Sequence, residues 1–267
     1  MFVADSHTHC NHSHDSFVPP EEMIENAIAK GASYMAMTDH CDKDYALIPE
    51  FFDIKQIDLD SHFKQARALQ ERYKGKLQIG VGLECGYYAP ADKLYREILA
   101  QYPTDVVINS VHVVNEEDCY YDSYFTRGRK AAYGMYVQAV LDSVNADFPY
   151  DIIGHIGYVA RKAPFENRAL RYEEFPDMFD EILRGIIQKG KALEVNGRGT
   201  GIPYIPEDGI LRRYRELGGE LVTYGSDAHY PQLQLIHYSE VKEGLKALGF
   251  RYIFHYLDHK PVAAEID

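Results

Sequence analysis

Two histidines separated by one residue, His7 and His9, stand near the amino terminus in the segment Asp5-Ser6-His7-Thr8-His9. Side chains two positions apart in an extended strand point to the same side, so both imidazoles can reach one ion. Further His and acidic residues follow short apolar runs later in the chain, namely His40, Glu84, His112, His155, Asp227 and His229. Imidazole and carboxylate ligands suit Zn²⁺, Mn²⁺ or Fe²⁺. The residues therefore predict a catalytic metal centre.

The candidate ligands outnumber those that a single ion needs. A catalytic zinc takes about three protein ligands and leaves one position open. The set therefore predicts two or three divalent cations, with Glu84 as the natural bridge between neighbouring ions. The four cysteines form no C-x-x-C pair, which argues against a closed structural zinc site.

Apolar runs and helical segments alternate along the chain, and this rhythm predicts the elements that must position the ligands. Strands are expected at 2–5, 34–38, 77–83, 106–111, 152–154, 193–195 and 221–224, each followed by polar residues. Helices are expected at 20–30, 60–73, 93–101, 130–145, 173–189, 208–217 and 233–248. Parallel βα units over 267 residues indicate one α/β barrel domain, residues 1–267. An open doubly wound sheet is the alternative, but such a sheet concentrates its site at one switch point.

Two connections, 42–58 and 113–128, are longer than a βα turn needs, and the second is rich in Tyr and acidic residues. Loops of this kind are expected over the mouth of a barrel, where they determine specificity.

Composition narrows the classes of partner and the compartment. The net charge of -13 disfavours nucleic acid, whose binding depends on Lys and Arg contacts to phosphates. The apolar runs are too short for a membrane span, and the first residues do not resemble a signal peptide. The cysteine spacing indicates no disulfide framework. A cytoplasmic enzyme acting on a small metabolite is expected.

Together these motifs resemble the PHP (polymerase and histidinol phosphatase) family over essentially the whole chain. The resemblance rests on Asp5-x-His7-x-His9, Thr38-Asp39-His40, Glu84, His112, His155 and Asp227-x-His229, in this order. It is greatest to the monofunctional histidinol-phosphate phosphatases of that family. The resemblance implies a distorted (β/α)7 barrel with a trinuclear metal site.

The resemblance also implies how the ligands are shared. The first metal would take His7, His9, Glu84 and Asp227, and the second Glu84, His112 and His155. The third would take His40, His229 and a residue of the loop after the first strand. Family members often have a histidine six residues beyond the second His of H-x-H, whereas this chain has Asp15 there. Asp15 is the expected ligand, with His14 and then His12 as alternatives, and a two-metal site is expected if none of them binds.

Charge favours a phosphate ester as the substrate. Six neutral imidazoles and the carboxylates of Glu84, Asp227 and Asp15 carry about -3, so three divalent ions leave a local excess of about +3. Arg161 and Arg198 follow strand ends and are expected to bind phosphate oxygens through their planar guanidinium groups, with Asn196 as a supporting group.

The expected reaction is hydrolysis of L-histidinol phosphate to L-histidinol and phosphate, with attack on phosphorus by a metal-activated water. Asp39, His40 or Asp227 could protonate the leaving oxygen. Glu116, in the acidic loop, is expected to bind the ammonium and imidazole groups of this substrate.

Three other functions are compatible with a ligand-rich barrel. The first is a PHP phosphoesterase for another small ester such as a nucleotide. The second is an amidohydrolase-type C–N hydrolase, which would usually carry a bridging Lys or Glu after the fourth strand; Glu84 after the third strand argues against it. The third is a metal-binding regulator without activity.

Overall fold

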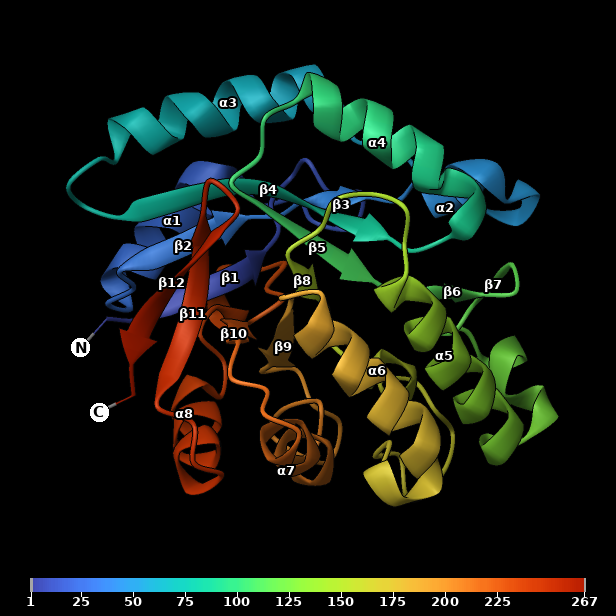
Figure 1. The fold of residues 1–267 in the computed structure, drawn as a ribbon. Helices are drawn as coiled ribbons and strands as arrows, with labels where there is room; N and C mark the ends of the chain where they lie inside the picture. The colour runs from blue at the N-terminus through green and yellow to red at the C-terminus, as the bar shows by residue number, and fades with distance from the viewer. Residues whose placement is uncertain (1, 267) are drawn as a thin grey trace.

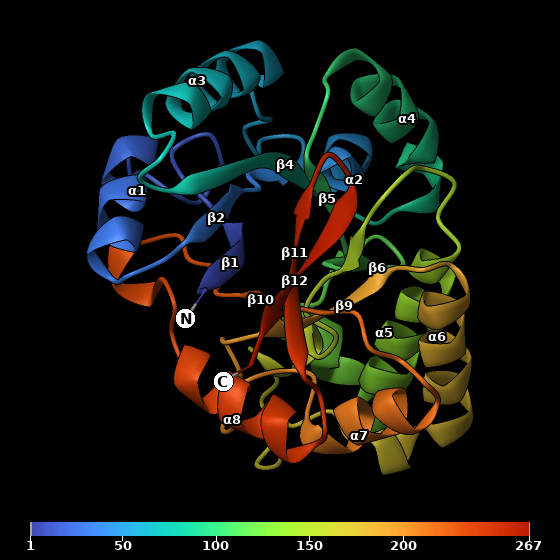
Figure 2. The ribbon, with the colours of Figure 1, turned by 60° about the vertical axis from the view of Figure 1, so that its left-hand side comes forward.

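The computed structural model describes residues 2–266 and contains all seven expected strands. They are β1 (Ala4–Thr8), β2 (Tyr34–Met37), β4 (Gln78–Gly86), β5 (Val106–Ser110), β8 (Ile152–Ile153), β9 (Ala192–Asn196) and β10 (Val222–Gly225). They are parallel neighbours in the order β1-β2-β4-β5-β8-β9-β10, and helices cover the outer side of the curved sheet (Figures 1 and 2).

The long helices are α1 (Pro20–Ala29), α3 (Leu59–Arg72), α4 (Asp92–Gln101), α5 (Arg129–Val144), α6 (Pro176–Gln188), α7 (Asp208–Glu216) and α8 (Tyr238–Ala247). Each lies within a predicted range or departs from it by one residue, but the last prediction began too early. Leu233 ends a short 3-10 helix, η6 (Pro231–Leu233), and the backbone then has positive φ at Leu235 and His237. Two such residues cannot belong to a right-handed α-helix, so α8 starts only at Tyr238.

Two carboxyl-terminal strands that were not predicted distort the barrel. β11 (Tyr252–Leu257) pairs in parallel with β10, and β12 (Lys260–Glu265) returns antiparallel to β11. The carboxyl end of β1 also meets the residues that follow β10. The amide of His9 donates to the carbonyl of Ala228 at 2.9 Å, and the amide of Asp227 donates to the carbonyl of His7 at 2.8 Å. The (β/α)7 barrel is thus closed by one bridge at its carboxyl end.

Side chains fill the amino end of the barrel, so this end is a packed core. Tyr34 and Tyr256 are buried there among Ala4, Ala36, Val106, Ile108, Ile152 and Ala192. The hydroxyl of Tyr34 donates to the carbonyl of Tyr256 at 2.9 Å and lies over Gly80, where a Cβ would come within 2.1 Å of it. Polar side chains begin only above this layer.

An extra residue in β1 turns the first two ligands toward the barrel axis. The register advances by three residues from Asp5 to Thr8 while the partner strand advances by two, from Met35 to Met37. Such a bulge shifts the alternation of side chains by one position. Ala4 packs in the barrel core, and beyond the bulge it is the odd-numbered His7 and His9 that face the site.

The two long connections have short elements of their own and reach the carboxyl end, as expected. The first follows β3 (His40–Cys41) and contains α2 (Lys43–Leu47) and η1 (Pro49–Phe51). The second contains the hairpin β6 (Val113–Val114) and β7 (Glu117–Asp118) and then η3 (Asp122–Arg127). Shorter 3-10 turns are η2 (Ala89–Ala91), η4 (Tyr158–Ala160) and η5 (Tyr172–Glu174). Within residues 2–266, none of the helices has the length and apolar character that a membrane crossing requires.

Candidate metal centre and substrate cavity

Glu84, buried at the end of β4, lies between two groups of histidines. Its Oε2 is 3.2 Å from Nε2 of His7 and 3.5 Å from Nε2 of His9. Its Oε1 is 2.8 Å from Nε2 of His155 and 3.4 Å from Nε2 of His112. The two oxygens of one carboxylate thus face different sets of imidazoles, which is the arrangement that a bridging ligand needs.

Asp227 completes the first group from the opposite side of the barrel. Its Oδ1 is 3.2 Å from Nε2 of His9 and 3.8 Å from Nε2 of His7. The backbone of Asp227 has a φ of 50°, an uncommon conformation for a residue with a side chain. The bridge to His7 that closes the barrel holds this conformation in place.

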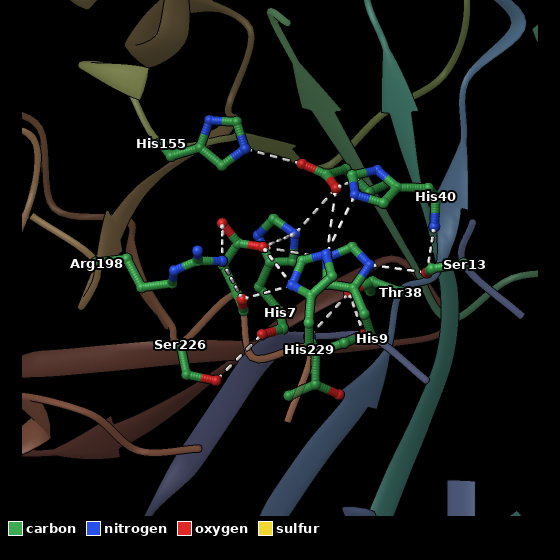
Figure 3. A network of polar contacts seen from close by, with 12 residues as sticks. His7, His9, Ser13, Thr38, His40, His155, Arg198, Ser226 and His229 are labelled. Carbon is green, nitrogen blue, oxygen red and sulfur yellow. Dashed lines mark hydrogen bonds and ion pairs between the residues drawn. The ribbon is translucent and has the colours of Figure 1, made fainter. Parts of the chain in front are cut away.

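A third group lies toward the mouth of the barrel, where Figure 3 shows the rings of His40 and His229 beside that of His9. Nε2 of His229 is 3.0 Å from Oδ2 of Asp15 and 3.4 Å from Nε2 of His40. Asp15 Oδ1 is 3.7 Å from the same nitrogen of His40. The structure therefore places Asp15, the expected replacement for a histidine, beside the other two expected ligands.

The two alternatives to Asp15 are placed differently from each other: the ring of His14 lies 5.2 Å from that of His40 and lines the cavity, whereas His12 does not. His14 Nδ1 faces Asp42 Oδ2 at 3.6 Å, and His12 Nε2 is 2.8 Å from Gln65 Oε1. His12 therefore points away from this group.

The donor atoms fit metal ions in position and in chemistry. Atoms bound tetrahedrally at about 2.1 Å from one zinc lie about 3.4 Å from each other, close to the separations in all three groups. Among the described residues, the buried atoms His7 Nε2, His9 Nε2 and Glu84 Oε2 have no hydrogen-bond partner. A buried polar atom without a partner is costly, and a shared cation would satisfy all three.

Arg161 and Arg198 lie next to the first group. Arg161 Nη1 donates to Asp227 Oδ2 at 2.6 Å and Nη2 to Asn196 Oδ1 at 3.1 Å, while Arg198 Nη1 donates to the carbonyl of Asp227 at 2.9 Å. Burial alone would raise the pKa of Asp227, but the two arginines and His7 outweigh it and hold this pKa well below its usual range. Asp227 is therefore a carboxylate and not a proton donor in this arrangement.

A cavity of about 500 Å³ opens above the three groups. Arg161, Arg198 and His229 line its floor side, and Tyr45, Tyr120 and Tyr158 line its aromatic wall. The wall contains one buried carboxylate, Asp118, whose Oδ2 accepts from the Tyr45 hydroxyl at 2.6 Å and whose Oδ1 accepts from the Tyr120 amide at 2.7 Å. The cavity is thus lined both by two arginines and by a carboxylate, Asp118, that lies among tyrosines.

Two residues that the sequence predicts to act on the substrate, Glu116 and Asp39, do not line the cavity. Glu116 is exposed and accepts from the Tyr88 hydroxyl at 3.0 Å, and it is not among the residues that line the cavity, because the turn between β6 and β7 carries it outward. Asp39 is buried beneath the loop after β1, where its Oδ1 accepts from the Cys10 amide at 2.7 Å and from the Ser13 hydroxyl at 2.7 Å. This carboxylate holds the loop and does not face the cavity.

Sequence reasoning missed three carboxylates in the site. Asp118 is two residues from the predicted Glu116, and only the β6–β7 turn decides which of them faces inward. Asp42 is buried within 3.4 Å of Nδ1 of His40 and 3.7 Å of Nδ1 of His112. Glu194 is buried in β9 against His7. Glu194 had a detectable signal, because it is an acidic residue inside an otherwise apolar strand.

Comparison with known proteins agrees with this geometry. Residues 5–198 match the family model of the PHP domain. The chain belongs to the PHP family. This PHP protein is 29% identical to the histidinol-phosphatase of Lactococcus lactis over 254 residues, covering 94% of the chain and 93% of the relative. It is 30% identical to the probable histidinol-phosphatase of Clostridium acetobutylicum over 231 residues, covering 85% of the chain and 87% of that relative.

A solved structure extends the similarity to three dimensions. The crystal structure of the Lactococcus lactis histidinol phosphate phosphatase, complexed with zinc, L-histidinol and phosphate, matches with a TM-score of 0.89 at 28% identity. The match covers 97% of the present chain and 98% of the other. The barrel predicted from the sequence is therefore confirmed as a PHP fold.

Proposed function

We propose that this protein is a metal-dependent histidinol-phosphatase, which hydrolyses L-histidinol phosphate to L-histidinol and phosphate. The observation that carries the proposal is the position of Glu84, whose two oxygens face separate histidine groups, one of which shares Asp227 with a pair of arginines. The names of the relatives in Lactococcus lactis and Clostridium acetobutylicum support the same activity.

We assign His7, His9, Glu84 and Asp227 to a first divalent metal, Glu84, His112 and His155 to a second, and Asp15, His40 and His229 to a third. The zinc in the Lactococcus lactis structure favours zinc for this chain too. When bound, such cations supply a water that deprotonates near neutral pH and positive charge for the phosphate oxygens.

The side chains of the protein orient the ester. Arg161 is fixed by Asp227 and Asn196, and the remaining N–H groups of Arg161 and Arg198 can bind phosphate oxygens as charge-assisted donors. Among the tyrosines that line the cavity, the carboxylate of Asp118 suits the ammonium or imidazolium of histidinol, and the tyrosines give its ring an aromatic wall. We infer that the ester binds with its phosphate over the metal ligands and with its ammonium and imidazole groups away from them.

The proton for the leaving oxygen has fewer possible sources than the sequence indicates. Asp39 faces away from the cavity, and the arginines keep Asp227 ionised. His40 lines the cavity, but its Nε2 belongs to the third group of ligands and its Nδ1 is 3.4 Å from Asp42 Oδ2, so we assign the proton to none of these three groups. On the sequence alone, we further propose that the reaction takes place in the cytoplasm.

The direct test is an assay on protein purified without chelator. Metals are counted per chain, and phosphate release is measured with L-histidinol phosphate and with a panel of sugar, nucleotide and amino-alcohol phosphates. A clear preference for histidinol phosphate is expected. Equal rates across the panel would refute the substrate assignment, and the absence of turnover on every ester after reconstitution with zinc, manganese or iron would refute the phosphatase itself.

A further inference from the structure

Glu194 lies in β9 with its side chain turned toward His7 and His155, and it is only 1% exposed. Its Oε1 is 2.7 Å from Nδ1 of His7. Its Oε2 is 2.5 Å from the backbone N of His155 and accepts that amide proton. One carboxylate therefore contacts a residue of each of two histidine groups that share Glu84.

The space for this carboxylate depends on a glycine. A Cβ at Gly225, at the end of β10, would come within 2.0 Å of Oε1 of Glu194 and 2.7 Å of Cβ of His7. No other residue type could stand at position 225 without moving the Glu194–His7 pair. The strand end is thus shaped around the contact between these two side chains.

The contact determines which nitrogen of His7 is free. A carboxylate can only accept, so Nδ1 of His7 carries a proton, and in the neutral imidazole that binds a metal Nε2 is then the nitrogen with the free lone pair. That Nε2 faces Oε2 of Glu84 at 3.2 Å and Oδ1 of Asp227 at 3.8 Å. A second hydrogen-bonded partner of this kind fixes the ring of a ligating histidine and increases its basicity.

The second contact acts on the other group. The amide of His155 begins the turn after β8, and the side chain of the same residue brings Nε2 within 2.8 Å of Oε1 of Glu84. Anchoring this amide therefore fixes the point from which the imidazole reaches the bridging carboxylate.

We propose that Glu194 is a positioning residue that couples two halves of the metal centre, by orienting His7 and anchoring His155 without binding a metal itself. Both of its oxygens are occupied by N–H donors, which distinguishes it from Glu84, whose Oε2 has no hydrogen-bond partner among the described residues. The proposal depends on the metal centre of the proposed function but not on the identity of the substrate.

The test compares Glu194→Gln with Asp151→Asn. Glutamine offers one accepting oxygen, so either His7 Nδ1–H or the His155 amide would face an NH₂ group. Asp151 is a matched control at the amino end of β8, because its buried Oδ2 likewise accepts from a backbone amide, that of Val107 at 2.8 Å, and from a histidine Nδ1, that of His259 at 2.9 Å. The substitution Asp151→Asn should lower the stability of the protein but leave metal binding unchanged.

Metal-free protein is titrated with Co²⁺ and followed by absorbance and calorimetry, with no substrate present. Glu194→Gln is expected to bind about 10- to 100-fold more weakly than the wild type, with the same number of ions at saturation. Asp151→Asn is expected to bind like the wild type. Should Glu194→Gln fail to fold, Glu194→Asp keeps the charge but shortens the side chain, so that one carboxylate no longer reaches both His7 Nδ1 and the His155 amide, and it is expected to weaken binding in the same way.

Three results would overturn the proposal. Affinity within twofold of the wild type would show that Glu194 does not position a ligand. An equal loss in Asp151→Asn would show a general effect of buried carboxylates. Loss of an ion at saturating Co²⁺ would show that Glu194 is itself a ligand. Failure to hydrolyse histidinol phosphate would refute only the substrate assignment, since the titration measures no turnover.

Discussion

Asp118→Asn tests how the cavity recognises the cationic end of its substrate. Asp118 is 6% exposed, and the Tyr45 hydroxyl and the Tyr120 amide each donate to one of its oxygens. A carboxylate has about four accepting positions, so roughly two remain for a substrate N–H group. Asparagine keeps the shape of the side chain but removes the charge and one acceptor.

The expected loss follows from the strength of one charged hydrogen bond. Such a bond contributes about 1.5–3 kcal/mol, which corresponds to about a 10- to 150-fold lower kcat/KM for L-histidinol phosphate. Burial of Asp118 favours the upper half of this range, because solvent screens a buried pair less. Propyl phosphate has neither an amine nor an imidazole, so its kcat/KM should change by less than about twofold.

The assay measures phosphate release from both esters by the wild type, Asp118→Asn and Glu116→Ala. Glu116 is a close control, since it lies two residues away but is exposed and bonded to Tyr88. The reasoning fails if Asp118→Asn slows both esters equally, or if Glu116→Ala reproduces its selectivity.

Three further predictions concern other parts of the molecule. Arg161→Lys removes the paired donors to Asp227 and Asn196, so kcat/KM should fall by about 100-fold or more for histidinol phosphate and propyl phosphate alike; a loss on one ester only would contradict a role in phosphate binding. Treatment with a chelator should abolish phosphate release and lower Tm. Each ion whose free concentration is about 1,000 times its Kd adds about 4 kcal/mol to the free energy of unfolding, and this contribution is lost with the ion. Full activity in metal-free protein would refute the metal centre. His255 is 2% exposed, and burial lowers its pKa from 6.5 to about 4, so between these pH values the unfolded chain takes up a proton that the folded chain does not. The stability that it contributes is therefore complete above about pH 6.5 and is lost as the pH falls toward 4, by about 3 kcal/mol. Urea unfolding of metal-free wild type and His255→Phe should show a stability difference that changes with pH in this window, and a constant difference would refute the shift.

The predictions from sequence succeeded where one local rule was sufficient. Most of the seven βα strands contain an apolar run with a polar residue at or just after its end, and parallel strands bring such ends together. His7, Glu84 and Asp227 could therefore be grouped without knowledge of the fold. β11 and β12 carry no ligand after their ends, and β12 is largely exposed, so neither gave this signal.

The remainder depends on contacts between distant segments. Asp39 follows a strand as the ligands do, but the backbone amides of Cys10 and Ser13, in the loop after β1, donate to its Oδ1. The β6–β7 hairpin determines whether Glu116 or Asp118 faces the cavity. The backbone conformations at Leu235 and His237 determine that α8 starts later than predicted. Glu194 lies inside a predicted strand, and its role appears only in the structure, where its side chain contacts His7 of β1.

The bridge that closes the barrel has a consequence for synthesis of the chain. It joins His9 to Ala228, and the first group of ligands likewise spans the chain from His7 to Asp227. Contacts of such sequence separation form late, and a chain emerging from the ribosome makes its amino-terminal half first. A nascent polypeptide would therefore present His7 and His9 as an incomplete site until its final third has been made. Tight metal retention then distinguishes finished molecules from prematurely terminated ones.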